Sequence, residues 1–425
     1  MNILIISFQL VLCLALLIAA SIISFRLKLF KQSENIIPKS RGWRIVQAVF
    51  LWIAFIANLA GIAVPFLVFF ASCIAFATAI PLVFKAAHVK LSNLWALPAL
   101  LMILSVTVGI AKPLGLKVIA LPKADELPLN ICSARVIKTY DEGLWFEGIA
   151  AGDDGTLYLS GNRNIDFSRG DYYHTAQGEL IERKSDGSEH ILFKTPMGNT
   201  SGVPFLAPDK SIYLTSHGAT SCIWRINNSN QPVQIVQFPK GAWPNGLDEG
   251  PDGMLYSADS QLGVIWRIDP KTGSLEEAMR DPALLARPFI SLAPGANGLH
   301  FKGRDLLVTV SDRTTLLKYT VDEKGKLGKS SVIATGIPGD DFAIGQDGSL
   351  FVTTHPYNTV VKISPAGERT IIGKMEQHIN GATDAIFGKS PHDINTLYVV
   401  TDGGAFTGGP KTRGELVVLE PYSKK

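Results

Sequence analysis

A strand–turn–strand unit that recurs through the C-terminal two-thirds of the chain is the strongest constraint on its fold. Each copy carries a polar residue at its start, followed by a short apolar strand, a turn rich in glycine or charged residues, and a second strand. The four clearest copies read FEGIAAGDDGTLYLS, PNGLDEGPDGMLYSADS, ANGLHFKGRDLLVTVSD and DDFAIGQDGSLFVTTH. The polar residues at their equivalent starting points are Glu147, Asn245, Asn297 and Asp340.

Two weaker copies fit the same spacing, SGVPFLAPDKSIYLTSHG from Ser201 and GATDAIFGKSPHDINTLYVVTDGG from Gly381. Strand-only units of about 40 to 55 residues are typical of the four-stranded blades of a β-propeller. The sequence therefore predicts an all-β, six-bladed β-propeller over residues 134–425. The alternating stretch ARVIKT, Ala134–Thr139, precedes the first unit, and we expect it to complete the sixth blade as its outer strand.

The first 111 residues are almost wholly apolar, in contrast to the rest of the chain. Apolar stretches long enough to cross about 30 Å of hydrocarbon predict an α-helical transmembrane domain of about four helices. The spans are expected near residues 3–25, 45–62, 66–84 and 94–111, and residues 112–133 form a linker. We interpret this domain as an anchor in the lipid bilayer.

The loops that carry lysine and arginine are those between the first and second spans and between the third and fourth. The positive-inside rule places both loops in the cytoplasm. The propeller is therefore expected outside the cytoplasm, in a periplasmic or extracellular location.

Charge and cysteine content exclude two classes of function. A formal net charge of +3, without a basic cluster outside the membrane part, excludes nucleic acid as a partner. No CxxC or Cys/His spacing of the kind found in zinc-binding modules is present. A Cys132–Cys222 disulfide and the oligomeric state stay open at this point.

If the repeats surround an axis, their polar starting residues converge on it. The two carboxylates and two amide carbonyls of that set are hard oxygen donors, which suit Ca²⁺. Other divalent cations, Mg²⁺, Mn²⁺ or Zn²⁺, are the alternatives. Residues just after the second strands are expected to rim the central pocket, namely Asn162, His217, Asp259, Ser260, Asp312, His355 and Asp402.

The FEG, PNGL, ANGL and GDDFAIGQDG motifs resemble the senescence-marker-protein and gluconolactonase family of six-bladed propellers, with the related paraoxonases and diisopropylfluorophosphatase. The resemblance covers roughly residues 134–420. It implies that Glu147, Asn297 and Asp340 are the core metal ligands. Asn245 would be a fourth ligand, or would hold a metal-bound water or the substrate. Asp341 replaces the glycine usual after the aspartate, and of the two we favour Asp340 as the ligand.

The resemblance also implies a calcium-dependent hydrolase of lactones or related esters, with a small-molecule substrate that is hydrophobic if it derives from the membrane. Asp340 is the first candidate for the base or nucleophile, and His355 and His217 are candidate proton shuttles. No Gly-x-Ser-x-Gly motif is present, which disfavours a serine hydrolase.

Two other functions compete with hydrolysis. The first is a non-catalytic propeller that keeps calcium for stability and acts as an extracytoplasmic binding or scaffolding module. The second is an enzyme of the strictosidine-synthase-like branch, which the set of four polar residues argues against because that branch lacks these ligands.

Overall fold

The computed structural model of the protein describes residues 126–165, 171, 173–227, 230–287 and 293–422, together with Val49, Trp52 and Ile56. The chain divides into two units, Met1–Ala120 and Leu121–Lys425, and the description below concerns the second. The predicted membrane spans lie outside the described residues. Among the residues that are described, no helix is long and apolar enough to cross a membrane.

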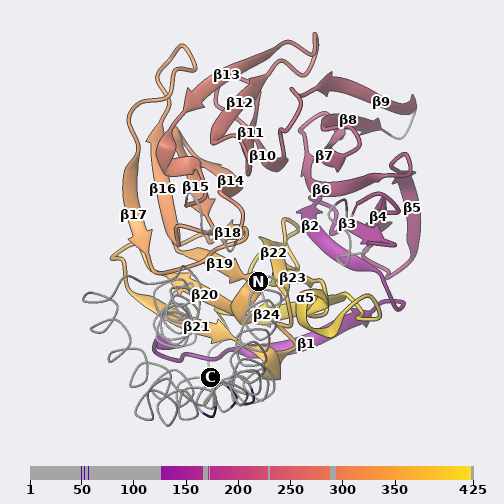
Figure 1. The fold of residues 1–425 in the computed structure, drawn as a ribbon, viewed down its shortest axis with the longest axis vertical. Coiled ribbons are helices and arrows are strands. Elements are labelled where there is room, and N and C mark those ends of the chain that lie inside the picture. Colours follow the sequence, from indigo (N-terminus) through magenta and orange to yellow (C-terminus); the bar gives the residue numbers. More distant parts are fainter. Residues whose placement is uncertain are drawn as a thin grey trace, which may run out of the picture. The chain divides into compact units, whose positions relative to one another are not determined.

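The described part of the second unit is an all-β, propeller-like fold (Figure 1). Four separate sheets have four strands each, and an eight-stranded sheet consists of two four-stranded halves joined by one parallel bridge, Gln177 to Asn199. This gives six four-stranded units, referred to below as blades and numbered along the chain. Within each blade the neighbouring strands are antiparallel.

The first three blades take up the chain from Trp145 to Arg280. Blade 1 contains β2 (Trp145–Ala151), β3 (Leu157–Arg163), β4 (Gln177–Arg183) and β5 (Glu189–Lys194). Blade 2 contains β6 (Asn199–Leu206), β7 (Ile212–Gly218), β8 (Cys222–Asn227) and β9 (Asn230–Gln237). Blade 3 contains β10 (Pro244–Glu249), β11 (Leu255–Asp259), β12 (Val264–Ile268) and β13 (Leu275–Arg280).

The last three blades follow, with short helices between some strands. Blade 4 contains β14 (Ala296–Lys302), β15 (Asp305–Val310), β16 (Thr315–Thr320) and β17 (Ser331–Thr335). Blade 5 contains β18 (Phe342–Ile344), β19 (Leu350–Thr354), β20 (Thr359–Ile363) and β21 (Arg369–Gly373), and blade 6 contains β22 (Ala382–Phe387), β23 (Leu397–Thr401), β24 (Glu415–Glu420) and β1 (Ser133–Thr139). The helices are η3 (Pro282–Leu284), η4 (His355–Tyr357), η5 (Met375–Gln377) and α5 (Ala405–Gly408).

Strand β1 lies beside β24, at the outer edge of blade 6. The prediction that Ala134–Thr139 completes this blade is therefore confirmed. The first strand of the propeller thus pairs with the last, so the ring is closed by backbone hydrogen bonds between the two ends of this unit.

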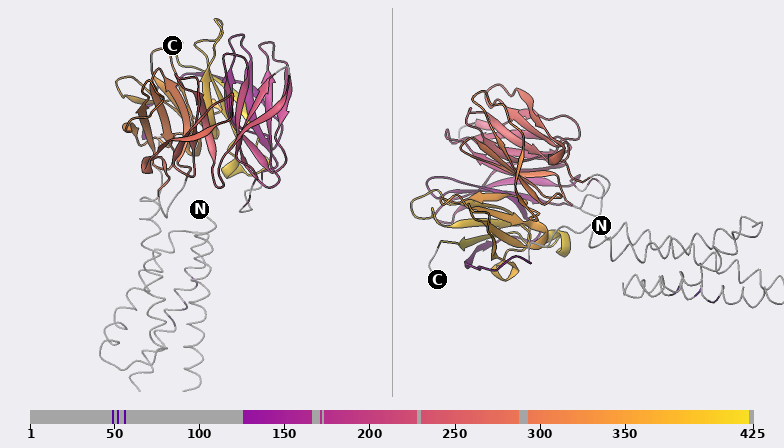
Figure 2. Two further views of the ribbon diagram at one scale, coloured as in Figure 1. Left: turned by 90° about the horizontal axis from the view of Figure 1, so that it is seen from above. Right: turned by 90° about the vertical axis from the view of Figure 1, so that its left-hand side faces the viewer.

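The inner strands β2, β6, β10, β14, β18 and β22 contact their neighbours all the way around the ring. In side view the strands of the blades stand roughly upright, so the inner strands run along the central axis (Figure 2). The start of each inner strand pairs with the end of the second strand, as Pro244 does with Asp259 and Ala296 with Val310. Both features therefore lie at the same end of the axis, as the repeats predicted.

The apolar core is divided into clusters that lie between adjacent blades. One joins Tyr256 and Ala258 of blade 3 to Leu299 and Val308 of blade 4, and all four side chains are fully buried. Both faces of a blade pack against neighbouring blades, and strands such as β11 and β19 are accordingly buried along their whole length.

Cys132 and Cys222 do not form a disulfide, so the pairing that the sequence left open is not present. Cys222 is buried within blade 2, and Cys132 precedes β1 at the edge of blade 6.

The glycine after each Asn at a blade start is needed for close packing. A Cβ atom on Gly246 would lie 2.5 Å from the backbone oxygen of Asn297 and 2.5 Å from the backbone nitrogen of Leu299. Backbone atoms cannot yield as a flexible side chain would. We therefore expect Gly246→Ala to lower the free energy of unfolding by about 1–3 kcal/mol.

Chemical denaturation of the full chain measures this change. Gly328→Ala is the matched control, because a Cβ atom there would meet Thr320 O at 3.4 Å and no other atom of the described residues within 4 Å. It should change stability by no more than about 0.5 kcal/mol. Equal stabilities for the two variants would contradict the close approach of blades 3 and 4.

Candidate functional site

The predicted ligands come from the starts of four inner strands. Glu147 lies in β2, Asn245 in β10 and Asn297 in β14, and Asp340 stands two residues before β18. Both asparagines are buried, and the two acids are half-buried. The fold thus brings these four strand starts to one end of the central axis.

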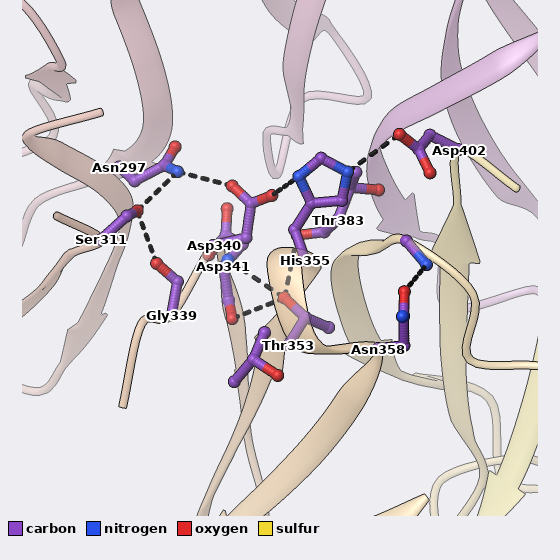
Figure 3. A network of polar contacts seen from close by, with 12 residues as sticks. Asn297, Ser311, Gly339, Asp340, Asp341, Thr353, His355, Asn358, Thr383 and Asp402 are labelled. Atoms are coloured by element: carbon purple, nitrogen blue, oxygen red, sulfur yellow. Dashed lines mark hydrogen bonds and ion pairs between the residues drawn. The ribbon is translucent and has the colours of Figure 1, made fainter. Parts of the chain in front are cut away.

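The amide of Asn297 is fixed by two neighbours (Figure 3). Its Nδ2 donates hydrogen bonds to Ser311 Oγ at 3.0 Å and to Asp340 Oδ1 at 2.5 Å. Ser311 in turn donates to the backbone oxygen of Gly339 at 2.6 Å. Because the nitrogen is engaged by the scaffold, the amide oxygen is the atom that Asn297 can offer to a cation.

The same arrangement of hydrogen bonds, from asparagine to serine to the backbone of the next blade, recurs in blade 3. Asn245 Nδ2 donates to Ser260 Oγ at 3.4 Å, and Ser260 donates to the backbone oxygen of Ala296 at 2.7 Å. In each case the serine follows the second strand of the blade and bonds to the start of the next blade. The two amides are therefore held in equivalent orientations.

His355 lies between two carboxylates (Figure 3). Its Nε2 is 2.8 Å from Asp402 Oδ2, and its Nδ1 is 3.6 Å from Asp340 Oδ2. Burial lowers the pKa of His355, but the charges of Asp402, Asp340 and Glu147 outweigh burial and raise that pKa to about 9. His355 is therefore protonated at neutral pH.

Both predicted acidic ligands have a raised pKa. Burial, together with the charge of Asp340, raises the pKa of Glu147 to about 8. Burial raises the pKa of Asp340 to about 7, against the opposing effect of His355. Carboxyl groups that resist ionisation in this way are stabilised as anions by a divalent cation, so this oxygen donor set fits a hard ion such as Ca²⁺.

His217, the other predicted proton shuttle, lies near the end of β7 in blade 2. Its Nδ1 lies 2.8 Å from Thr200 Oγ1, and its ring packs against Trp243 with centroids 4.7 Å apart. Burial lowers the pKa of His217 to about 4, so it is neutral at pH 7. Trp243 precedes Asn245 by two residues, so the ring that packs against His217 belongs to the segment that leads into blade 3.

Two of the predicted rim residues are engaged in holding turns. Asp259 Oδ1 accepts backbone hydrogen bonds from Trp243, Gln261 and Leu262, and its Oδ2 accepts from Trp266 Nε1 at 2.9 Å. Asp312 forms an ion pair with Arg287 at 2.9 Å. These contacts stabilise the loops, and we assign neither aspartate a chemical role.

A second polar cluster, which the sequence reasoning missed, contains His300, Asp341 and Asp384. Burial and the charge of Asp341 raise the pKa of Asp384 well above its usual value. One signal was available: Asp341 was noted as a departure from glycine. Asp341 alone does not predict the cluster, because Asp384 and His300 belong to other blades and no sequence spacing links them to Asp341.

No family model matches the sequence, and no curated protein matches it. Among solved structures, a luciferin-regenerating enzyme aligns with a TM-score of 0.50 at 13% identity, over 69% of this chain and 96% of that chain. A protein described as a "putative gluconolactonase" gives 0.49 at 18% identity, over 71% of this chain and 97% of that chain. The pyrroloquinoline-quinone-bound aldose sugar dehydrogenase of Streptomyces coelicolor gives 0.45 at 17% identity, over 68% and 99%. At these identities the likeness shows the fold alone.

The raised pKa values of Glu147, Asp340 and His355 predict how stability depends on pH without metal. Each group holds its proton more tightly in the folded than in the unfolded chain. Stability of the metal-free protein should therefore fall as pH rises from about 5 to about 9. Calcium should restore it, and by more at high pH, because the ion replaces the proton on the carboxylates.

Thermal unfolding of the full chain after chelation, with and without Ca²⁺ across this pH range, measures the effect. Glu147→Gln should flatten the pH dependence of the metal-free protein. A calcium-induced rise in Tm that is the same at every pH would contradict the assignment.

Proposed function

We propose that the chain is a membrane-anchored, divalent-metal-dependent hydrolase of lactones or related esters, with its active site at the centre of a six-bladed propeller. The observation that carries this proposal is the linked set Asn297–Asp340–His355–Asp402, in which an amide, two carboxylates and a protonated histidine meet at one end of the axis. The charge of Asp340, at the start of blade 5, raises the pKa of Glu147, at the start of blade 1.

The metal would be held by Glu147, Asn245, Asn297 and Asp340, and calcium suits these donors best. When bound, it would supply Lewis-acid polarisation of the ester carbonyl oxygen. The remaining chemistry is assigned to side chains of the protein.

Hydrolysis requires that water loses a proton as its oxygen bonds to the carbonyl carbon, and that the leaving oxygen gains a proton as its bond to that carbon breaks. Asp340 is the proposed acceptor of the first proton, and the protonated His355 is the proposed donor of the second. The 3.6 Å separation of Asp340 Oδ2 and His355 Nδ1 allows the proton to return between turnovers. Asp402 holds the imidazole in orientation, and Asn245 and His217 are proposed to position water or substrate.

A panel of lactones and aryl esters, assayed with the full chain before and after chelation, tests the hydrolase. We expect chelation to abolish turnover and readded Ca²⁺ to restore it. Asp340→Ala should lower kcat by at least about 100-fold, since it removes both a ligand and the proton acceptor.

Asp153→Asn is the control, because Asp153 is exposed and contacts Lys210; its activity should match that of the unchanged chain. If Ca²⁺ stabilises the protein but no member of the panel is hydrolysed, the competing function, a calcium-stabilised binding or scaffolding module, would replace the hydrolase.

We also propose that residues 1–111 anchor the chain through about four helices and that the propeller lies outside the cytoplasm. The charge distribution of the loops supports this orientation. Alkaline phosphatase fused after Lys425 should be active, because it folds only outside the cytoplasm, and a fusion in the loop near residue 88 should be inactive. The reverse pattern would overturn the orientation.

A further inference from the structure

A second cluster of side chains of the kinds that ligate metals comes from β14, from the residue directly before β18, and from β22. One donor atom each from His300, Asp341 and Asp384 lies within 4.8 Å of those of the other two. Asp341 and Asp384 are 3% and 2% exposed, and His300 is half-buried. None of the three is among the residues assigned to hydrolysis.

Equivalent positions in two blades supply the two aspartates. A threonine in the second strand donates to the backbone oxygen of the next blade start: Thr309 to Asp340 at 2.7 Å, and Thr353 to Thr383 at 2.9 Å. Thr383 therefore occupies the position of Asp340, and Asp384 the position of Asp341.

In blade 4 the residue at this position is Gly298. A Cβ atom on Gly298 would lie 2.2 Å from Asp341 Oδ1, so the side chain of Asp341 fills the space that the glycine leaves. Two consecutive blades thus carry a carboxylate where the motifs of blades 1, 3 and 4 carry glycine.

One carboxylate oxygen in the cluster lacks a hydrogen-bond partner within the described part of the chain. Asp341 Oδ1 accepts a backbone hydrogen bond from Phe342 and lies 3.0 Å from His300 Nε2. Asp341 Oδ2 is buried and has no hydrogen-bond partner among the described residues. A buried carboxylate oxygen left unpaired is costly, and a coordinated cation would satisfy it.

His300 is oriented in the manner usual for a metal ligand. Its Nε2 faces Asp341, while its Nδ1 lies 3.7 Å from Asp248 Oδ2 on the opposite side of the ring. Asp248 is itself fixed by the backbone N–H of Phe301 at 2.7 Å. Histidines that bind metals commonly present their second nitrogen to a carboxylate in this way, which fixes the ring and its tautomer.

We propose that His300, Asp341 and Asp384 bind a second divalent cation, and that this ion is of the class that takes imidazole together with carboxylate, such as Zn²⁺, Mn²⁺ or Co²⁺. The nitrogen donor separates this site from the all-oxygen set at Glu147, Asn245, Asn297 and Asp340. The ion balances charge, because three carboxylates including Asp248 face a single imidazole. It also joins the inner strands of blades 4, 5 and 6.

Cobalt binding by the full chain in excess Ca²⁺ tests this site, because Ca²⁺ occupies the oxygen site and Co²⁺ reports nitrogen ligation in its visible spectrum. We expect one Co²⁺ per chain by elemental analysis. His300→Ala and Asp384→Asn should each weaken Co²⁺ binding at least about tenfold, because the loss of even an outer-shell partner typically has an effect of that size.

Glu147→Gln, which alters the oxygen site, is the matched control and should leave Co²⁺ binding unchanged. Metal content is the readout, so the result does not depend on whether any ester is hydrolysed. Asp384→Asn keeps the size and one acceptor of the side chain, so it remains informative if His300→Ala fails to fold. Absence of bound Co²⁺ in the unchanged chain, or equal loss in Glu147→Gln, would overturn the proposal.

Discussion

The close approach of neighbouring inner strands around the axis is the constraint on which the site depends. Gly246 and Gly298 allow it, because a side chain at either position would collide with the backbone of the next blade. Threonine and serine hydroxyls then bond across the same gap, as Ser311 does to Gly339. The residues at the strand starts are thereby held near one another although they lie far apart in the sequence.

Close approach of the strands also buries several carboxylates near one another, and each of the two polar clusters contains one histidine beside them. At the strand starts, the positive charge of His355 lies between Asp340 and Asp402, and the pKa of Glu147 still rises to about 8. Deeper along the inner strands, His300 faces Asp341 and Asp248. In both places the buried negative charge exceeds the nearby positive charge, which is the condition that favours a bound cation.

The strand-start residues could be predicted from the sequence because they recur at a fixed position in a repeated unit. The repeat placed Glu147, Asn245, Asn297 and Asp340 at strand starts, where the structure has them, and the alternating stretch before the first repeat predicted the outer strand of blade 6. The partnership of His355 with Asp402 could not be predicted, since 47 residues separate them and no motif links them. His300 and Asp384 were missed for the same reason. Asp259 and Asp312 fitted the rim pattern but hold turns.

The sequence by itself determined the repeat, its strand-only character and the type of donor at each strand start, because periodicity and residue chemistry are local properties. Tertiary structure decided which of these side chains lie close together and which of them hold turns. It also decided which carboxylate oxygens stay unpaired among the described residues. Those outcomes depend on how closely blades approach one another and on which charges are buried together. Such distances arise only when segments far apart in the chain pack around a common axis.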